Sequence, residues 1–141
     1  MRYLILLLAI LLPYRSFAAS WEDCISGTSE TQIYEGTALC VDLASGDLTT
    51  DILDVRKCDN FDVIYEPDTT STGTAITVSP YNCTSATASP NSCGLIGGLV
   101  LSGTPPDTEI YGAAGAWIYF VGSGTIGATT PRILVHCNGP K

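Results

Sequence analysis

The chain predicts an all-β fold: an antiparallel β-sandwich, jelly-roll-like, of about seven or eight strands stapled by disulfides. After an apolar N-terminal segment, short runs rich in Val, Ile, Thr and Tyr alternate with clusters of Gly, Pro, Ser, Asn and Asp. This alternation is typical of strands and turns. No apolar run with a helical period extends beyond about two turns in this part of the chain. A small closed β-barrel is the alternative fold.

Residues 1–18 are interpreted as a cleaved signal peptide, and residues 19–141 as a single β domain. An apolar run over residues 4–12 is followed by small residues, with Ser16 and Ala18 at the positions that signal peptidase reads. The run is shorter than a membrane-spanning helix requires. We therefore expect a secreted protein, extracellular or periplasmic, with no membrane span after cleavage.

The charge balance excludes several kinds of partner. The chain has 6 Lys and Arg against 14 Asp and Glu, for a formal net charge of −8. So few cations cannot neutralise a row of phosphates, which argues against nucleic-acid binding. The same balance argues against docking on an anionic lipid surface.

Six cysteines in an exported chain indicate disulfides. About fifteen pairings are available, and spacing alone does not choose among them. We expect a short loop closed by one pair, a second nearby pair, and a third that ties an early strand to the last one. These pairs are Cys83–Cys93, Cys24–Cys40 and Cys58–Cys137. The third would restrict the unfolded chain most, because it closes the longest loop.

Three strands are expected in the N-terminal half of the domain. Residues 32–43 predict the first, with Gly36 as a candidate β-bulge, and residues 52–56 predict a shorter one. The clearest pattern is NFDVIYE, residues 60–66, where apolar and acidic side chains alternate. One face of that strand should pack on the core.

The next expected strand covers residues 74–83, with Ile76 and Val78 pointing inward. Pro80 lacks the N–H that a ladder needs, so it predicts an edge strand or a bulge.

Farther along, residues 95–103 are apolar enough for a central strand, although adjacent glycines weaken the pattern. Residues 104–109 predict a loop, and residues 110–112 at most a short strand.

The last two strands, residues 116–122 and 132–137, are expected to pair across a loop rich in glycine and threonine. In the first of them Trp117 and Tyr119 share one face. Both faces are apolar, which predicts a central strand covered on both sides. In the second, Ile133, Val135 and Cys137 face one way, and His136 faces the other way beside Leu134.

A glycine-led aromatic strand, a loop and a last strand RILV resemble the closing hairpin of bacterial exported β-sandwiches such as pre-peptidase C-terminal-like domains. FDVIYEPDT followed by AITV is similar to the earlier strand pair of such domains. The likeness covers residues 59–138 and extends to uncharacterised surface proteins of phage-like and environmental sequences. IYGAAGAWIYFVGSGTI resembles allene-oxide-cyclase and dirigent barrels, with AAGA in place of a glycine-rich GGTG. Neither resemblance supplies a catalytic residue.

The residues argue against an enzyme. His136 is the only histidine, so a metal site with several histidines cannot form within one chain. No GxSxG motif marks a nucleophilic serine, and all six cysteines can pair. Paired carboxylates for glycoside hydrolysis would need a defined separation that no motif here supplies. No catalytic residue is therefore expected.

Calcium is the one candidate cofactor. Four acidic residues lie close together in the sequence near expected strand ends, and carboxylate oxygens are the ligands that calcium takes. They are Asp59, Asp62, Glu66 and Asp68.

Four aromatic residues are candidates for stacking on a sugar: Trp117, Tyr119, Tyr111 and Tyr81. The competing interpretation is that they fill the core, which we expect for Trp117 and Tyr119. Asn82 begins a glycosylation sequon, NCT, whose middle cysteine would hinder modification once paired.

The sequence thus predicts a non-catalytic exported domain with a structural or adhesive role, acting by self-association or through a surface protein partner. A carbohydrate- or small-ligand-binding module, with a glycan as partner, is the alternative. A dirigent or allene-oxide-cyclase-like barrel is the third interpretation and requires a closed cavity.

Overall fold

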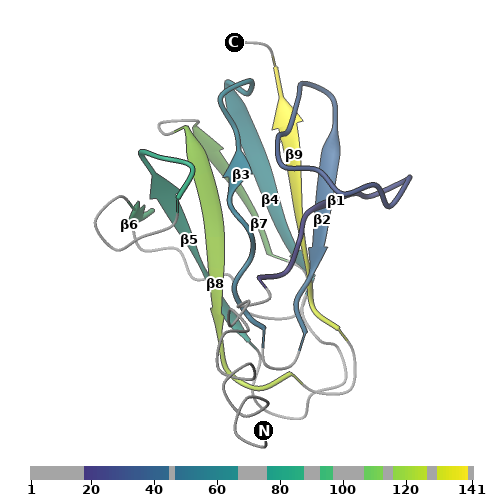
Figure 1. Ribbon diagram of the computed structural model, residues 1–141, viewed down its shortest axis with the longest axis vertical. Helices are drawn as coiled ribbons and strands as arrows, with labels where there is room; N and C mark the ends of the chain where they lie inside the picture. Colours follow the sequence, from purple (N-terminus) through teal and green to yellow (C-terminus); the bar gives the residue numbers. More distant parts are fainter. Residues whose placement is uncertain are drawn as a thin grey trace, which may run out of the picture.

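A computed structural model describes residues 18–44, 47–66, 76–87, 93–96, 107–112, 116–126 and 130–139, with the backbone alone for residues 107–112. These residues form an all-β structure in which two separate sheets face each other (Figure 1). The two sheets share no strand in the described part of the chain, so the sandwich is confirmed and the closed barrel is not formed. None of the described residues belongs to a helix that could span a membrane.

The larger sheet has five strands in the order β1-β2-β9-β4-β7. Their bounds are Glu22–Asp23 for β1, Ala38–Asp42 for β2, Arg132–Asn138 for β9, Asn60–Glu66 for β4 and Asp107–Gly112 for β7. The smaller sheet has the order β3-β8-β5-β6. Its strands are Leu53–Asp54 for β3, Trp117–Ser123 for β8, Thr77–Cys83 for β5 and Cys93–Leu95 for β6. All neighbouring strands pair antiparallel.

The last two strands do not form the hairpin that the sequence suggested. β8 pairs with β3 and β5, whereas β9 lies in the other sheet between β2 and β4 (Figure 1). β4 and β5, which also follow each other in the chain, are split between the sheets in the same way. Alternation along a strand reveals which side chains face the core. It does not reveal the neighbouring strand, so both arrangements fit the sequence.

Strand β4 matches the predicted range, while other strands differ from expectation. β2 begins at Ala38 because the chain turns just before it, with the Thr37 N–H donating to the Tyr34 carbonyl at 3.0 Å. Gly36 has a φ of 72° in this turn and is not a bulge. β7 is longer than expected and includes part of the predicted loop, because residues 107–112 pair with residues 60–65 of β4. Only the beginning of the predicted strand 95–103 is among the described residues.

Pro80 lies inside the smaller sheet and does not mark an edge strand. It is paired with Phe120 of β8, and β6 lies on the other side of its strand. The Pro80 carbonyl accepts the Ile96 N–H at 3.0 Å just beyond the end of β6. The amide nitrogen and the carbonyl of a strand residue point to the same side. The N–H that Pro80 lacks would therefore face the position just beyond the three-residue β6, where the strand has already ended.

The core fills the space between the sheets. It contains side chains from both layers, among them Val63, Tyr65, Ile118, Phe120 and Val135, and Ile76 and Val78 are buried as predicted. Trp21, just before β1, is 1% exposed and packs edge-to-face on Phe120 at 5.8 Å. Its indole N–H donates to the Asp51 carbonyl at 2.8 Å. The N-terminal segment therefore closes one end of the core.

The three predicted disulfides are confirmed. Cys24–Cys40 and Cys83–Cys93 span 16 and 10 residues, and Cys58–Cys137 joins the turn before β4 to β9 across 79 residues. Three disulfides indicate that the folded protein occupies an oxidising environment.

Candidate functional site

Strand β8 divides its side chains between the core and an outer surface. Ile118 and Phe120 point inward and are buried, whereas Trp117 and Tyr119 are half-buried on the other side of the sheet. The expectation that Trp117 and Tyr119 fill the core is therefore wrong. β8 is central within its sheet as predicted, but the second sheet covers only one face of it. We call the outer surface formed by Trp117, Tyr119, Tyr81 and Leu95 the aromatic face.

The middle of the aromatic face is one row of side chains across three strands. Tyr81 of β5 is paired with Tyr119 of β8 on one side and Leu95 of β6 on the other. The two tyrosine rings stack with centroids 5.1 Å apart and an interplanar angle of 27°. Burial and, secondly, the adjacent Tyr81 raise the pKa of the Tyr119 phenol. Leu95 is 53% exposed, so an apolar row faces solvent here.

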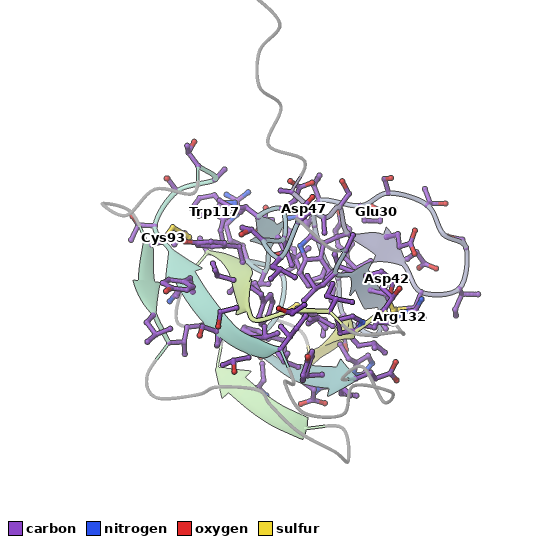
Figure 2. All side chains as sticks on the ribbon, turned by 90° about the horizontal axis from the view of Figure 1, so that it is seen from below. Glu30, Asp42, Asp47, Cys93, Trp117 and Arg132 are labelled. Atoms are coloured by element: carbon purple, nitrogen blue, oxygen red, sulfur yellow. A yellow bond between two sulfur atoms is a disulfide. The ribbon has the colours of Figure 1, made fainter. Side chains whose placement is uncertain are left out.

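Trp117 lies in the next row, between a disulfide and an ion pair. It is paired with Cys83 of β5 and with Asp54 of β3. The Cys83–Cys93 disulfide links directly opposed residues of β5 and β6. Figure 2 shows Trp117 and Cys93 together at one side of the molecule, with Asp42 and Arg132 at the other.

A polar network adjoins the indole ring. The Arg56 guanidinium carbon lies 4.8 Å from the Trp117 ring centroid. Arg56 also donates to both oxygens of Asp54, from Nε at 3.0 Å and from Nη2 at 2.7 Å. The Gln32 amide donates to the same carboxylate at 3.0 Å, and the Tyr34 hydroxyl donates to Gln32 at 2.7 Å. Planar hydrogen-bonding groups are thus held beside an aromatic ring.

The charge state of Asp54 follows from these contacts. Burial alone would raise the pKa of its carboxyl. The hydrogen bonds from Arg56 and the nearby positive charge outweigh burial, so the pKa of Asp54 lies below its ordinary value. Asp54 is therefore ionised at neutral pH and holds Arg56 over Trp117.

Two hollows lie next to this network. One, of about 370 Å³, is lined by Thr31, Ile52, Asp54, Arg56, Ala86 and Trp117. The second, of about 480 Å³, is lined by Ala18, Thr31, Thr49, Thr50, Asp51, Ile52, Ala86 and Thr87. Both fall within the range of roughly 300–1,000 Å³ that is typical of small-molecule sites.

The structure gathers three of the four aromatic candidates. Trp117, Tyr119 and Tyr81 form the aromatic face, but Tyr111 lies in β7 of the other sheet, where its backbone pairs with Phe61. The sequence grouped these residues by chemistry and could not show that the chain places Tyr111 in the other layer.

The three acidic candidates that the structure describes do not form one metal-binding group. Asp62 and Glu66 are four residues apart on β4, about 13 Å along the strand, too far to share one ion. Each is paired in register with a basic residue of β9: Asp62 with His136, at 4.0 Å, and Glu66 with Arg132. Asp59 lies in the preceding bend, and Asp68 is outside the described residues. No group of three His, Cys, Asp or Glu in the described part of the chain could hold a metal ion.

Asn82 of the sequon lies within β5, paired with the core residue Ile118. Its Oδ1 is buried and has no hydrogen-bond partner among the described residues. The neighbouring Cys83 is paired, as the sequence suggested.

Sequence reasoning missed the polar part of the site. Asp54 and Arg56 were included in a short strand and carried no motif, although their spacing of two residues lets a side-chain pair form beside β3. Gln32 is distant in sequence and reaches Asp54 through a parallel bridge. Comparison of the chain with family models, curated proteins and solved structures found no match.

Proposed function

We propose that this chain is a non-catalytic exported domain that binds carbohydrate through Trp117 and the groups around it. The observation that carries the proposal is the outward position of Trp117, beside Arg56 and Asp54 and at the border of a hollow. A sheet face that no second sheet covers is ordinarily polar. Here it carries an indole, two phenols and a leucine.

The chemistry of the surroundings suits a sugar. An aromatic ring stacks on the C–H face of a pyranose, because it is apolar and flat. Carboxylate, amide and guanidinium groups then hydrogen-bond the hydroxyls at the rim of the sugar ring. Asp54, Gln32 and Arg56 provide these groups, and their mutual hydrogen bonds fix them before a ligand arrives. Such preorganisation lowers the entropic cost of binding.

Export is part of the same proposal. The N-terminal pattern of residues 1–18 supports a cleaved signal peptide, although residues 1–17 lie outside the described part of the chain. The three disulfides agree with a secreted location, whether extracellular or periplasmic.

The test is a glycan screen with the chain from Ala19, disulfides intact. Affinity electrophoresis on soluble polysaccharides and pull-down on insoluble ones would be followed by calorimetry of any hit. Trp117→Ala should weaken binding at least tenfold. Ile25→Ala is the matched control, because Ile25 is 98% exposed and lies outside the aromatic face. Equal affinity of both variants, or the absence of any glycan hit, would contradict the proposal.

A surface or assembly role, by self-association or with a surface protein partner, is the second candidate. Leu95, 53% exposed on the edge strand β6, is the observation that favours it. β7 is the longest edge strand in the described part of the chain, but its sequence carries Asp107 and Glu109, which would repel an identical edge. Light scattering after size exclusion, with and without calcium, separates the candidates. Defined oligomers that Leu95→Ser dissociates would favour assembly, and a monomer would favour the binding module.

A further inference from the structure

We propose that the two hollows form one groove that holds a linear, uncharged glycan chain of several sugars. One sugar would lie at Trp117, and the rest of the chain would extend toward Thr49. The inference rests on the proposed carbohydrate binding, and adds the ligand class and its direction across the surface.

The two hollows adjoin each other, because they share part of their lining. Thr31, Ile52 and Ala86 border both of them. Trp117 borders only the first, and Thr49 only the second. The shared residues therefore lie at the proposed junction, and a ligand that occupied both hollows would extend from Trp117 toward Thr49. Cleavage after Ala18 would remove one lining residue of the second hollow and leave Thr49, Thr50 and Asp51 in place. Each part has the volume of a small-molecule site, so the two together suit a ligand with repeated units.

The far half of the groove has a fixed framework. The Ala19 N–H donates to the Thr49 carbonyl, and the Asp51 N–H donates to the Ala19 carbonyl, both at 2.9 Å. The Thr50 hydroxyl accepts the Phe120 N–H at 3.0 Å and is buried. This segment is thus tied to the N-terminal residues and to β8 before any ligand binds. A preorganised wall loses little entropy on binding.

The side chains along the groove favour hydroxyl-rich ligands. Thr31 and Thr49 bring hydroxyls, and Asp51 brings a carboxylate that accepts the Ser20 hydroxyl at 3.0 Å. A carboxylate can accept several hydrogen bonds, so Asp51 has capacity for a sugar hydroxyl as well.

The charges argue for an uncharged chain. Arg56, the basic residue of the groove lining, is neutralised by its ion pair with Asp54 at 2.7 Å. Asp51 adds a negative charge, and the whole chain has a formal net charge of −8. A polyuronate or sulfated glycan would be repelled both locally and at longer range.

The test compares ligand lengths across three variants. The probes are cello-, xylo- and mannohexaose, the corresponding disaccharides, and hexagalacturonate, measured by calorimetry. In the unmodified chain a neutral hexaose should bind at least tenfold more tightly than its disaccharide. Ala86→Trp, which fills the junction, should reduce hexaose affinity at least tenfold, to that of the disaccharide. Thr31→Trp fills the same junction and serves if the first variant misfolds. Ile25→Trp adds an equal bulk at an exposed position outside the groove and should change neither affinity.

The outcomes separate the two proposals. Equal affinity for hexaose and disaccharide, or unchanged hexaose affinity in both junction variants, would overturn the groove. A retained loss with Trp117→Ala would then leave carbohydrate binding standing. Tighter binding of hexagalacturonate would overturn the uncharged ligand class. Absence of binding by every probe, together with a negative glycan screen, would overturn both proposals.

Discussion

The guanidinium of Arg56 lies over the indole of Trp117, 4.8 Å from the ring centroid, and is anchored there by Asp54. Trp117 and Asp54 are also paired across β8 and β3. One ion pair therefore positions a half-buried ring on an inner strand of the smaller sheet. The ion pair between Arg56 and Asp54 is therefore part of the proposed binding site.

Replacement of Arg56 by Gln should weaken glycan binding at least tenfold while the fold is retained. The change removes the cation that lies over Trp117 and the anchor to Asp54, so the indole gains rotational freedom that binding must then restrict. Calorimetry measures the affinity, and circular dichroism checks the fold. Arg132→Gln is the matched control, since Arg132 forms an exposed pair with Asp42 on the other sheet. Equal losses in both variants would contradict a local role for Arg56.

Stability should fall in acid partly through Asp54. The pKa of Asp54 is depressed in the folded protein, so its contribution is present above the pKa of the unfolded chain and is lost as the pH falls through the folded value. The expected window begins below about pH 4, the ordinary range of an aspartate. Urea unfolding at several pH values should show a shallower acid dependence for Asp54→Asn than for the unmodified chain. An identical slope would show that Asp54 is not among the groups responsible.

Local patterns in the sequence were sufficient to predict the sandwich and the bounds of β4. Alternation in residues 60–66 follows from burial of one strand face, and the structure buries Phe61, Val63 and Tyr65 as this requires. The compartment predicted that the cysteines pair, but spacing alone did not choose among the possible pairings, of which the structure forms the expected set.

The arrangement of partners could not be predicted in this way. The outer face of β8 is as apolar as its inner face, so alternation gave no sign that Trp117 faces outward. Which strands neighbour each other is decided by contacts between distant residues, such as Gln32 with Asp54. For this reason the β8–β9 hairpin was wrong and the polar half of the site was missed.

The three disulfides should differ in their contribution to stability. A cross-link stabilises mainly by restricting the unfolded chain, and the restriction grows with the loop that it closes. Loops of 79, 16 and 10 residues should contribute about 4.5, 3.1 and 2.7 kcal/mol on that account. Urea unfolding of three double variants, each with both cysteines of one disulfide replaced by alanine, measures the order of these contributions. A smaller loss for Cys58 and Cys137 than for either other pair would contradict it.

Loss of the Cys83–Cys93 disulfide should weaken ligand binding as well as stability. It closes the segment that contains Ala86, a residue of both hollows, and it adjoins Trp117. Alanine at both positions should leave the core intact but release this wall, with at least a tenfold loss in hexaose affinity. Alanine at Cys24 and Cys40 is the control, because that disulfide lies at the β1–β2 end of the other sheet. Unchanged affinity in the first variant would show that the wall does not depend on the cross-link.

The two tryptophans should report on different parts of the molecule. Trp21 is buried against Phe120, whereas Trp117 is half-buried on the aromatic face. In Trp21→Phe the remaining fluorescence comes from Trp117 and should be quenched strongly by acrylamide. In Trp117→Phe it comes from Trp21 and should be protected. A bound neutral hexaose should protect Trp117 and leave Trp21 unchanged, because only Trp117 borders the groove. Equal quenching of both variants without ligand would mean that the aromatic face is covered in solution, which would favour self-association over glycan binding.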